Sequence, residues 1–440
     1  MRIVSTLFLL VAFSVSTYSQ KGYAWKQASA NGYTYRYVTN DPMGTRFYTL
    51  KNGLSVILSK NAKEPRIAVR IAVRTGSNND PKDHTGLAHY LEHLLFKGTE
   101  KYGSLDWAKE KPLLDSIEDL YEVYGATKDE ASRKEIYKQI DRVSGEAAKF
   151  AIAGEYDKMM KALGSQRTNA HTFVEETVYE EDIPSNALDE FLTIQAERFR
   201  DPVFRIFHTE LEAVYEEKNR GLDNDNNKMQ EAMLATVFPT HNYGQQTTIG
   251  TIEHLKDPSI KAIEAYYNKY YVPNNMAIIM AGDFNPDALI KKIDQDFAYM
   301  QPKPVQEYMG PKEKPIDGPI VKEVYGPTSE SVRILYRSAP AGTRDAMLTD
   351  LVGSILSNGK AGLIDLNLNK QQKVLTAGSG LWQFKDYGLF LLLASPKQDQ
   401  TLDDVRELLL AQIGDLKKGN FLGFLNLSLN MNAFKLASKS

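Results

Sequence analysis

Three polar residues within a five-residue stretch have the spacing of a catalytic metal site. His89, Glu92 and His93 form the pattern His-x-x-Glu-His. On a helix, residues four apart lie on one face, so the two imidazoles can bind one metal ion. Glu92 lies on nearly the same face and can reach a water beside the metal without binding the ion itself. The pattern predicts a zinc peptidase site of the inverted type, with His89 and His93 as metal ligands and Glu92 as the catalytic base.

The residues around this trio favour a metal site over the alternative, a solvated helix that carries two surface histidines. Zinc suits nitrogen ligands and lowers the pKa of a bound water to about 7, so that a carboxylate can take its proton. A buried polar trio must be paired or metal-bound, because unpaired buried polar groups are costly. The neighbouring residues are apolar and predict that burial: Leu87, Ala88, Leu91, Leu94, Leu95 and Phe96.

Zinc in a catalytic site needs a third protein ligand, commonly a carboxylate, and keeps its fourth position for water. The segment 210–217 contains four glutamates that are candidates. Glu210 and Glu217 lie seven residues apart, two helical turns along one face. The spacing alone does not choose among the four, and each one by itself is equally typical of a solvated helix charge.

Composition excludes several other classes of protein. The 440 residues exceed one ordinary domain, and 42% apolar with 25% charged residues is typical of a soluble globular chain. The 53 basic and 56 acidic residues nearly cancel, which gives no electrostatic basis for a nucleic-acid or anionic-membrane partner. The chain has no cysteine, so disulfides, thiolate catalysis and cysteine-based metal centres are excluded.

The N-terminal residues 1–19 have the pattern of a signal peptide. Arg2 supplies the positive charge, an apolar stretch covers 3–15, and Thr17 and Ser19 are small residues at the positions that a signal peptidase reads. A membrane anchor is the alternative, but the apolar run is too short to span a bilayer. We therefore expect an exported chain, periplasmic or secreted, with no membrane span after cleavage.

Helices and strands that could position the metal site follow along the chain. Asn52-Gly53 between two apolar runs predicts a hairpin. The segment 86–97 reads as the metal-binding helix, with Thr85 as its cap and Gly98 as its stop. The other expected strands are 67–74, 168–179, 276–281, 332–336 and 388–394, and the other expected helices are 186–200, 207–220, 348–356 and 402–416.

Residues 104–160 differ from their surroundings. Apolar residues recur at helical spacing in two runs, 113–124 and 136–147, with a break at 125–130. This pattern predicts an amphipathic helical hairpin packed on the domain surface, and a docking arm for a partner is the alternative reading.

Because strands and helices are mixed along the chain without regular alternation, we expect an α+β protein. Residues 301–318 are rich in Pro, Lys, Glu and Gly, and predict a linker between two domains.

The chain resembles the M16 peptidase family, which includes pitrilysin, insulin-degrading enzyme and mitochondrial processing peptidase. The resemblance covers roughly residues 45–420. It is most specific in the stretch from His84 to Thr99, which contains the metal motif. Further similar segments are Thr168-Asn169-Ala170-His171-Thr172, Glu210 with Glu217, His241-x-Tyr243-Gly244 with Gly250-Thr251, and 271–283.

The resemblance implies a role for each matching residue. His89, His93 and Glu217 would be the zinc ligands, Glu92 the general base, and Glu210 a carboxylate that orients a ligand or the water. A peptide would bind as an added β-strand, its backbone paired with Asn169 and Ala170. We expect four parts along the chain. A signal peptide covers 1–19, and a catalytic domain with an insertion at about 104–160 covers 40–300. A linker at 301–318 then leads to a C-terminal-like domain at 319–440.

The implied fold is the LuxS/MPP-like metallohydrolase fold, with two homologous α+β domains of which the second is incomplete. The chain departs from the family in two respects. Glu217 follows His93 at a longer distance than in most members, and the insertion at 104–160 accounts for the excess. The apolar tail 421–432 does not resemble the family's helix there, and no acidic residue follows Asp415. A truncated C-terminal domain is therefore expected, and the alternative function is a non-catalytic or partner-dependent half that pairs with a second M16 half in a homo- or heterodimer.

Overall fold

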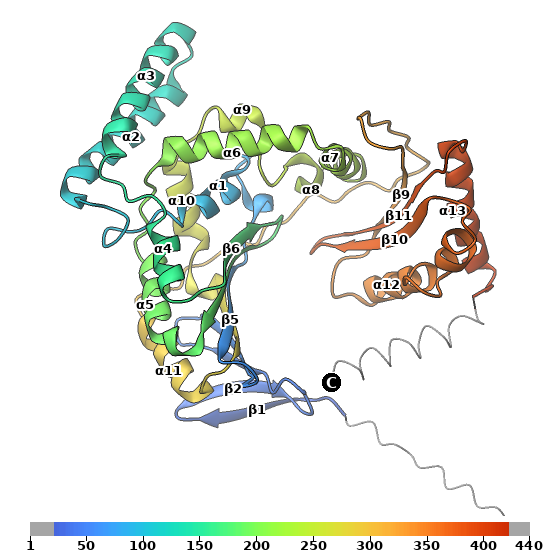
Figure 1. Ribbon diagram of the computed structural model, residues 1–440, viewed down its shortest axis with the longest axis horizontal. Helices are drawn as coiled ribbons and strands as arrows, with labels where there is room; N and C mark the ends of the chain where they lie inside the picture. The colour runs from blue at the N-terminus through green and yellow to red at the C-terminus, as the bar shows by residue number, and fades with distance from the viewer. Residues whose placement is uncertain (1–21, 422–440) are drawn as a thin grey trace, which may run out of the picture.

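The computed structural model describes residues 22–421. The expected signal peptide at 1–19 and the unusual tail after residue 421 lie outside the described residues. Within the described part, no helix is long and apolar enough to cross a membrane. Helices and strands form an α+β arrangement, as the sequence predicted (Figure 1).

The larger part of the molecule is built on a mixed eight-stranded sheet. The strand order is β1-β2-β3-β4-β8-β5-β7-β6, which places β6 at one free edge and β1 at the other. The strands are β1 Trp25–Ala30, β2 Tyr33–Val38, β3 Arg46–Thr49, β4 Ser55–Lys60, β5 Arg66–Val73, β6 Arg167–Thr172, β7 Thr177–Pro184 and β8 Met276–Gly282.

Local sequence explains the central strands. The predicted hairpin is confirmed: β3 and β4 are antiparallel, and the turn between them contains Gly53 at φ +87°. Glycine tolerates this left-handed conformation at low cost. In β5, exposed and buried residues alternate over most of the strand, because one face packs on helices. The predicted strands at 67–74 and 276–281 correspond to β5 and β8.

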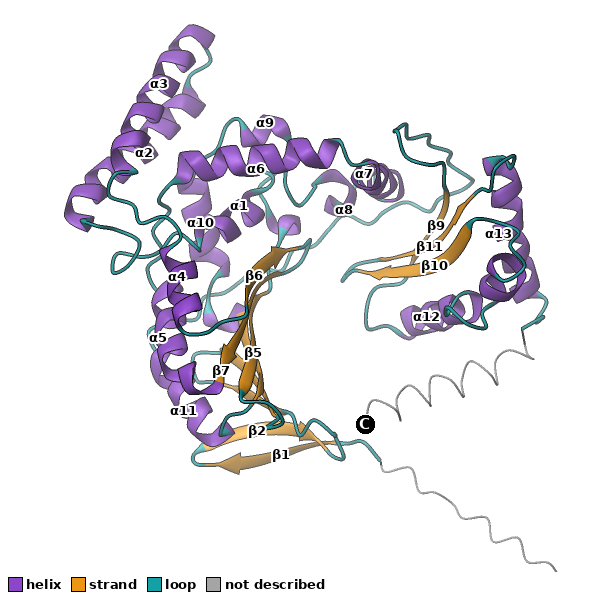
Figure 2. Ribbon diagram, viewed as in Figure 1, coloured by secondary structure: helices purple, strands orange, loops and turns teal. Residues whose placement is uncertain are grey.

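Helices cover one face of this sheet, and further helices, among them α1 and α6, pack beyond the C-terminal end of β6 (Figure 2). One core of apolar side chains joins most of these helices to the strands, and a smaller cluster contains the buried residues of α7 and α8. The helices are α1 Leu87–Leu94, α4 Glu155–Ala162, α5 Leu188–Arg198, α6 Phe207–Leu222, α7 Asp225–Val237, α8 Asn242–Gln245, α9 Ile252–Leu255, α10 Ile260–Tyr270 and α11 Pro286–Asp296.

The insertion is a helical hairpin of α2 Trp107–Ala126 and α3 Glu130–Ala147, and it projects from the body in Figure 1. Its base contacts α6 and α10. Arg205, completely buried, pairs through Nε with the Glu110 carboxylate of α2 at 3.0 Å. The same guanidinium donates to the carbonyls of Lys97, Thr99 and Tyr102. This buried pair attaches the insertion to the loop that follows α1.

The second part of the molecule is a three-stranded antiparallel sheet with helices against it. The strand order is β10-β11-β9, and a separate apolar core lies between this sheet and its helices. Residues 301–331, which connect the two parts, contain no helix or strand. The elements are β9 Val332–Ser338, α12 Arg344–Leu356, a π-helical segment Asp365–Asn369, β10 Thr376–Gln383, β11 Gly388–Ser395 and α13 Leu402–Lys417.

Several strands differ from the sequence predictions. The single strand expected at 168–179 is a hairpin of β6 and β7, because residues 173–176 turn the chain back. The sequence analysis missed β10, whose glycines at 378 and 380 weaken the strand pattern. Strands β1 and β2 were not predicted either; they add residues 25–38, which lie before the expected start of the domain at residue 40, to the main sheet. Each of these strands pairs with the strand next to it in the sequence, so hairpin turns place them in the sheets.

Candidate metal centre

Helix α1 carries the metal motif, and a buried carboxylate fixes its start. Asp80 accepts hydrogen bonds from the backbone N–H groups of Gly86, at 2.8 Å, and Ala88, at 2.9 Å. Burial raises the pKa of Asp80 to about 8, although these backbone hydrogen bonds act in the opposite direction. The prediction that Thr85 caps this helix is wrong, because Gly86 occupies the N-cap position. The Thr85 hydroxyl instead contacts Nδ1 of His254 at 2.7 Å.

A close backbone approach also positions the start of α1. Gly86 has φ +88° and faces Gly250, which has φ +82°. A Cβ on Gly86 would collide with the carbonyl of Ile249, and one on Gly250 would collide with Thr85. Only glycine fits both places, so the loop 247–251 packs directly against the entry to the motif helix.

The two histidines point toward Glu217 on helix α6. Nε2 of His89 lies 3.5 Å from Oε2 of Glu217, and Nε2 of His93 lies 3.8 Å from the same oxygen. One donor atom from each residue lies within 4.8 Å of the other two. Ligands at about 2.0–2.2 Å from a tetrahedral zinc are separated by roughly 3.3 Å. The donor set, two imidazole nitrogens and one carboxylate oxygen, therefore fits zinc in both chemistry and size.

The charges around His89 favour a cation at this position. Burial lowers the pKa of His89, but hydrogen bonds to Glu217 and Glu92 outweigh it and raise the pKa to about 9. The hydrogen bond with His89 lowers the pKa of Glu217. Both shifts have one physical cause: carboxylates surround the imidazole and stabilise positive charge between them. A metal ion can take the place of that proton.

Glu92 lies beside His89, next to the ring nitrogen opposite the one that faces Glu217. Its Oε2 is 3.6 Å from Nδ1 of His89 and accepts a hydrogen bond from the hydroxyl of Thr172 at 2.6 Å. Only 6% of Glu92 is exposed. Thr172 is the last residue of the edge strand β6, so the strand ends at the carboxylate that we expect to act as base.

The carboxylate of Glu210 on helix α6 lies next to the other ring nitrogen of His93 and is mostly buried. Its Oε2 is 3.4 Å from Nδ1 of His93, and its Oε1 pairs with Nζ of Lys97 at 2.6 Å. Burial raises the pKa of Glu210, but the contacts with His93 and Lys97 lower it below the usual value. Glu210 therefore places a carboxylate oxygen beside Nδ1 of His93, while Nε2 of the same ring faces Glu217.

The predicted peptide-binding residues lie on the free edge of the main sheet. Asn169 and Ala170 pair on one side with Glu180 and Tyr179 of β7, and no described strand pairs with β6 on its other side. Of the predicted site residues, the structure brings His89, His93, Glu217, Glu92 and Glu210 into one cluster. Asn169 and Ala170 lie farther along β6, in the strand that ends at this cluster.

Sequence reasoning missed two residues of this site. Asp80 gave no signal, because it lies in a loop and acts only through the folded position of α1. Thr172 was within the segment that resembles the family, but its contact with Glu92 depends on the arrangement of β6 against α1. Helix periodicity cannot predict either contact, since both join segments that are separate in the sequence.

Comparison with known proteins finds family models and relatives that match parts of this chain. The model described as Insulinase (Peptidase family M16) matches residues 55–111, and that described as Peptidase M16 inactive domain matches 259–421. The zinc protease PqqE of Helicobacter pylori is 25% identical over 382 residues, which cover 84% of this chain and 74% of that protein. The chain spans between 21% and 50% of four further curated relatives.

Solved structures show the same fold. A protease from Helicobacter pylori superposes with a TM-score of 0.69 at 24% identity, covering 89% of this chain and 85% of the other. The first half of the periplasmic protease PqqL from Escherichia coli gives a TM-score of 0.62 at 15% identity, covering 90% and 77%. These two likenesses support the predicted fold class.

Proposed function

Because this chain belongs to the M16 peptidase family, we propose that it is a zinc-dependent metalloendopeptidase that hydrolyses peptides or unfolded polypeptides. The observation that carries the proposal is the convergence of His89, His93 and Glu217 beside Glu92 at the end of a free sheet edge. Bound zinc supplies Lewis acidity, which acidifies water and polarises the scissile carbonyl.

The residues around the zinc position perform the remaining steps. Thr172 holds Oε2 of Glu92 and leaves Oε1 to take the proton of the attacking water. Glu92 then delivers this proton to the nitrogen of the leaving amine. Glu210 keeps the ring of His93 in the required tautomer and orientation. The low exposure of Glu92 limits competition from bulk water.

The substrate binds by addition of a strand to β6. Edge strands offer unpaired N–H and C=O groups, which accept peptides of many sequences through main-chain hydrogen bonds. Asn169 and Ala170 supply such groups on the free side of the strand. A peptide paired there is directed toward Thr172 and Glu92, so its backbone is presented to the cluster.

The other function to consider is a non-catalytic half, or one that needs a second M16 chain as a partner. The matched inactive-domain model covers residues 259–421, which contain none of the proposed ligands and not the base. That description therefore concerns the C-terminal part and leaves the cluster at 89–217 unaffected. We propose further that the chain acts outside the cytoplasm, because its N-terminus reads as an export signal.

Cleavage of a mixed pool of unstructured peptides by the full chain tests this function. Zinc-loaded protein, protein treated with a chelator, and the Glu92→Gln and His89→Ala variants are compared, with bound zinc measured for each. We expect chelator-sensitive cleavage, zinc without cleavage in Glu92→Gln, and neither in His89→Ala. Stoichiometric zinc with no cleavage by the wild-type chain would support the partner-dependent alternative.

A further inference from the structure

A cavity of about 500 Å³ opens beside the proposed metal ligand Glu217. Its walls come from α6, α7, the loop 243–249, the turn after β6 and the hairpin between β10 and β11. The main sheet and the small C-terminal sheet therefore both contribute to it. The apolar and aromatic side chains among its lining are Phe173, Val174, Leu234, Tyr243, Ile249, Trp382 and Phe384.

The charges in this lining are largely neutralised or lie at its margin. Lys218 is buried and pairs with Glu231 at 3.0 Å, so neither presents a free charge. Arg220 lies on the exposed side, where its charge acts on Glu217. Four aromatic rings and three aliphatic side chains form much of the wall, beside polar side chains such as Asn224, Asn227 and Gln230. The apolar part of this wall suits an apolar group.

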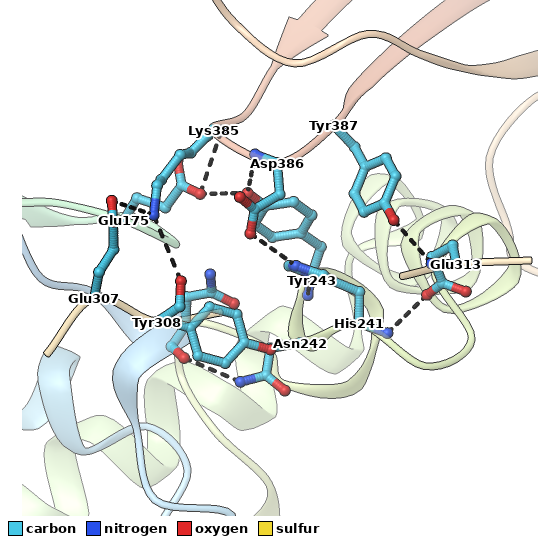
Figure 3. Close-up of polar contacts among 11 residues, drawn as sticks. Glu175, His241, Asn242, Tyr243, Glu307, Tyr308, Glu313, Lys385, Asp386 and Tyr387 are labelled. Carbon is cyan, nitrogen blue, oxygen red and sulfur yellow. Dashed lines mark hydrogen bonds and ion pairs between the residues drawn. The ribbon is translucent and has the colours of Figure 1, made fainter. Parts of the chain in front are cut away.

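The hairpin tip that supplies Trp382 and Phe384 is fixed to the larger part of the molecule. Figure 3 shows its polar contacts: the backbone N–H of Lys385 donates to the Glu175 carboxylate at 3.0 Å, and that of Asp386 donates to the Tyr243 hydroxyl at 3.1 Å. Nε2 of the buried His241 lies 3.2 Å from Oδ2 of Asp386.

Stacked aromatic rings reinforce these contacts. The ring of Phe384 lies 4.6 Å from that of Tyr243 at 30°, and 6.1 Å from that of Phe173 at 21°. Phe384, Tyr243 and Val174 belong to a small apolar cluster shared by the two parts of the molecule. These contacts hold the wall of the cavity in place before any substrate binds. A preformed pocket loses less conformational entropy when a ligand binds, which favours binding.

The position of Phe173 connects this cavity to the substrate path. Phe173 directly follows Thr172, whose hydroxyl contacts Glu92. A peptide that pairs with β6 and passes over the metal ligands continues past Phe173. Alternate side chains of an extended peptide point to opposite sides, so one residue close to the scissile bond can place its side chain in the cavity.

From this arrangement we propose that the cavity is a specificity subsite for a large apolar or aromatic side chain, with Trp382 and Phe384 as specificity-determining residues. The inference rests on the proposed peptidase function and names its substrate class. It also gives the C-terminal sheet a direct role, because the hairpin of β10 and β11 completes a pocket that the catalytic part leaves open.

The test measures cleavage of internally quenched peptides in which each of three positions on either side of the scissile bond is varied among Phe, Leu, Ala, Asp and Lys. For the wild-type chain we expect kcat/KM at one position to be at least roughly tenfold higher for Phe or Leu than for Ala. Trp382→Ala and Phe384→Ala should reduce that ratio several-fold, because kcat/KM should fall more for the Phe and Leu peptides than for the Ala peptide. Trp382 is only partly buried, so its variant should fold even if Phe384→Ala does not.

Tyr336→Ala is the matched control, because this half-exposed ring lies on β9 of the same small sheet and outside the cavity lining. It should keep the wild-type ratio. An unchanged ratio in Trp382→Ala, or a preference for Asp that depends on Arg220, would overturn the inference.

Peptide binding separates this inference from the function on which it rests. The affinities of Phe-containing and Ala-containing peptides are measured on zinc-loaded Glu92→Gln with and without Trp382→Ala. A preference for the Phe peptide that disappears with Trp382 supports the subsite even if the wild-type chain cleaves nothing, in which case only the catalytic proposal fails. Equal affinities in both backgrounds would overturn the subsite while leaving catalysis intact.

Discussion

The hydroxyl of Thr172, the last residue of edge strand β6, donates a 2.6 Å hydrogen bond to Oε2 of Glu92 in the metal-motif helix α1. This contact joins the surface on which we propose that a peptide pairs to the carboxylate that we propose as base. It fixes one carboxylate oxygen and determines which one is free to accept a proton.

Thr172→Val removes this donor while nearly preserving the volume of the side chain. We expect kcat to fall about tenfold or more, since the base loses its orientation, with a smaller change in KM. Thr172→Ser keeps the hydroxyl and should retain most of the activity. Steady-state kinetics on one quenched peptide give both constants. Equal loss in the two variants would show that the methyl group, and not the hydrogen bond, matters.

Glu210→Gln should weaken zinc binding by about 10–100-fold, because a neutral amide supports His93 less well than a carboxylate does. Competition with a chromogenic chelator measures the zinc affinity. Glu216→Gln is the control, since this exposed glutamate on the same helix accepts a hydrogen bond from Asn219 and makes no ion pair with the described histidines. If the two variants bound zinc equally well, Glu210 would have no role behind His93.

Glu110→Gln should lower the free energy of unfolding by about 3–5 kcal/mol, because it leaves the Arg205 guanidinium buried without its charge partner. Urea unfolding of the zinc-loaded chain checks this value. Asp115→Asn breaks the exposed ion pair with Lys111 on the same helix and should leave the unfolding midpoint nearly unchanged, because solvent screens such pairs. Similar losses in both would mean that the buried pair does not hold the insertion in place.

The stability of the metal-free chain should depend on pH through His89. Its pKa in the folded chain, about 9, exceeds the usual value of about 6.5 in an unfolded chain. Protonation therefore stabilises the fold: the contribution, on the order of 3 kcal/mol at most, is complete below pH 6.5 and is lost as the pH rises through 9.

Urea unfolding with excess chelator at pH 6, 7.5 and 9 measures this dependence. His89→Gln should reduce it, because one titrating group is gone; the part that remains below about pH 8 comes from Asp80, whose raised pKa of about 8 acts in the same direction. Zinc should show the opposite trend, since it displaces the same proton and binds more tightly as the pH rises toward 9. A metal-free wild-type chain that becomes more stable between pH 6.5 and 9 would contradict the assigned cause.

Local sequence determined those features that depend on neighbours along the chain. The spacing of His89, Glu92 and His93 predicted a helix with three polar groups on one face, and the structure has that helix. Asn52-Gly53 predicted the β3–β4 hairpin for a similar reason, because the turn conformation suits these residue types. Helix α6 was also predicted, but its spacing could not distinguish Glu217 from the other glutamates.

Tertiary structure alone decided which distant groups meet. Glu217 faces the histidines and Glu210 lies behind His93 because α6 packs against α1. Asp80 caps α1, Thr172 reaches Glu92, and the β10–β11 hairpin closes a cavity near Glu217 for the same kind of reason. Most of these contacts join residues that are far apart in the sequence, and the spacing within a helix or strand cannot predict any of them. The contacts form because burial of apolar side chains and strand pairing across the whole chain bring these segments together.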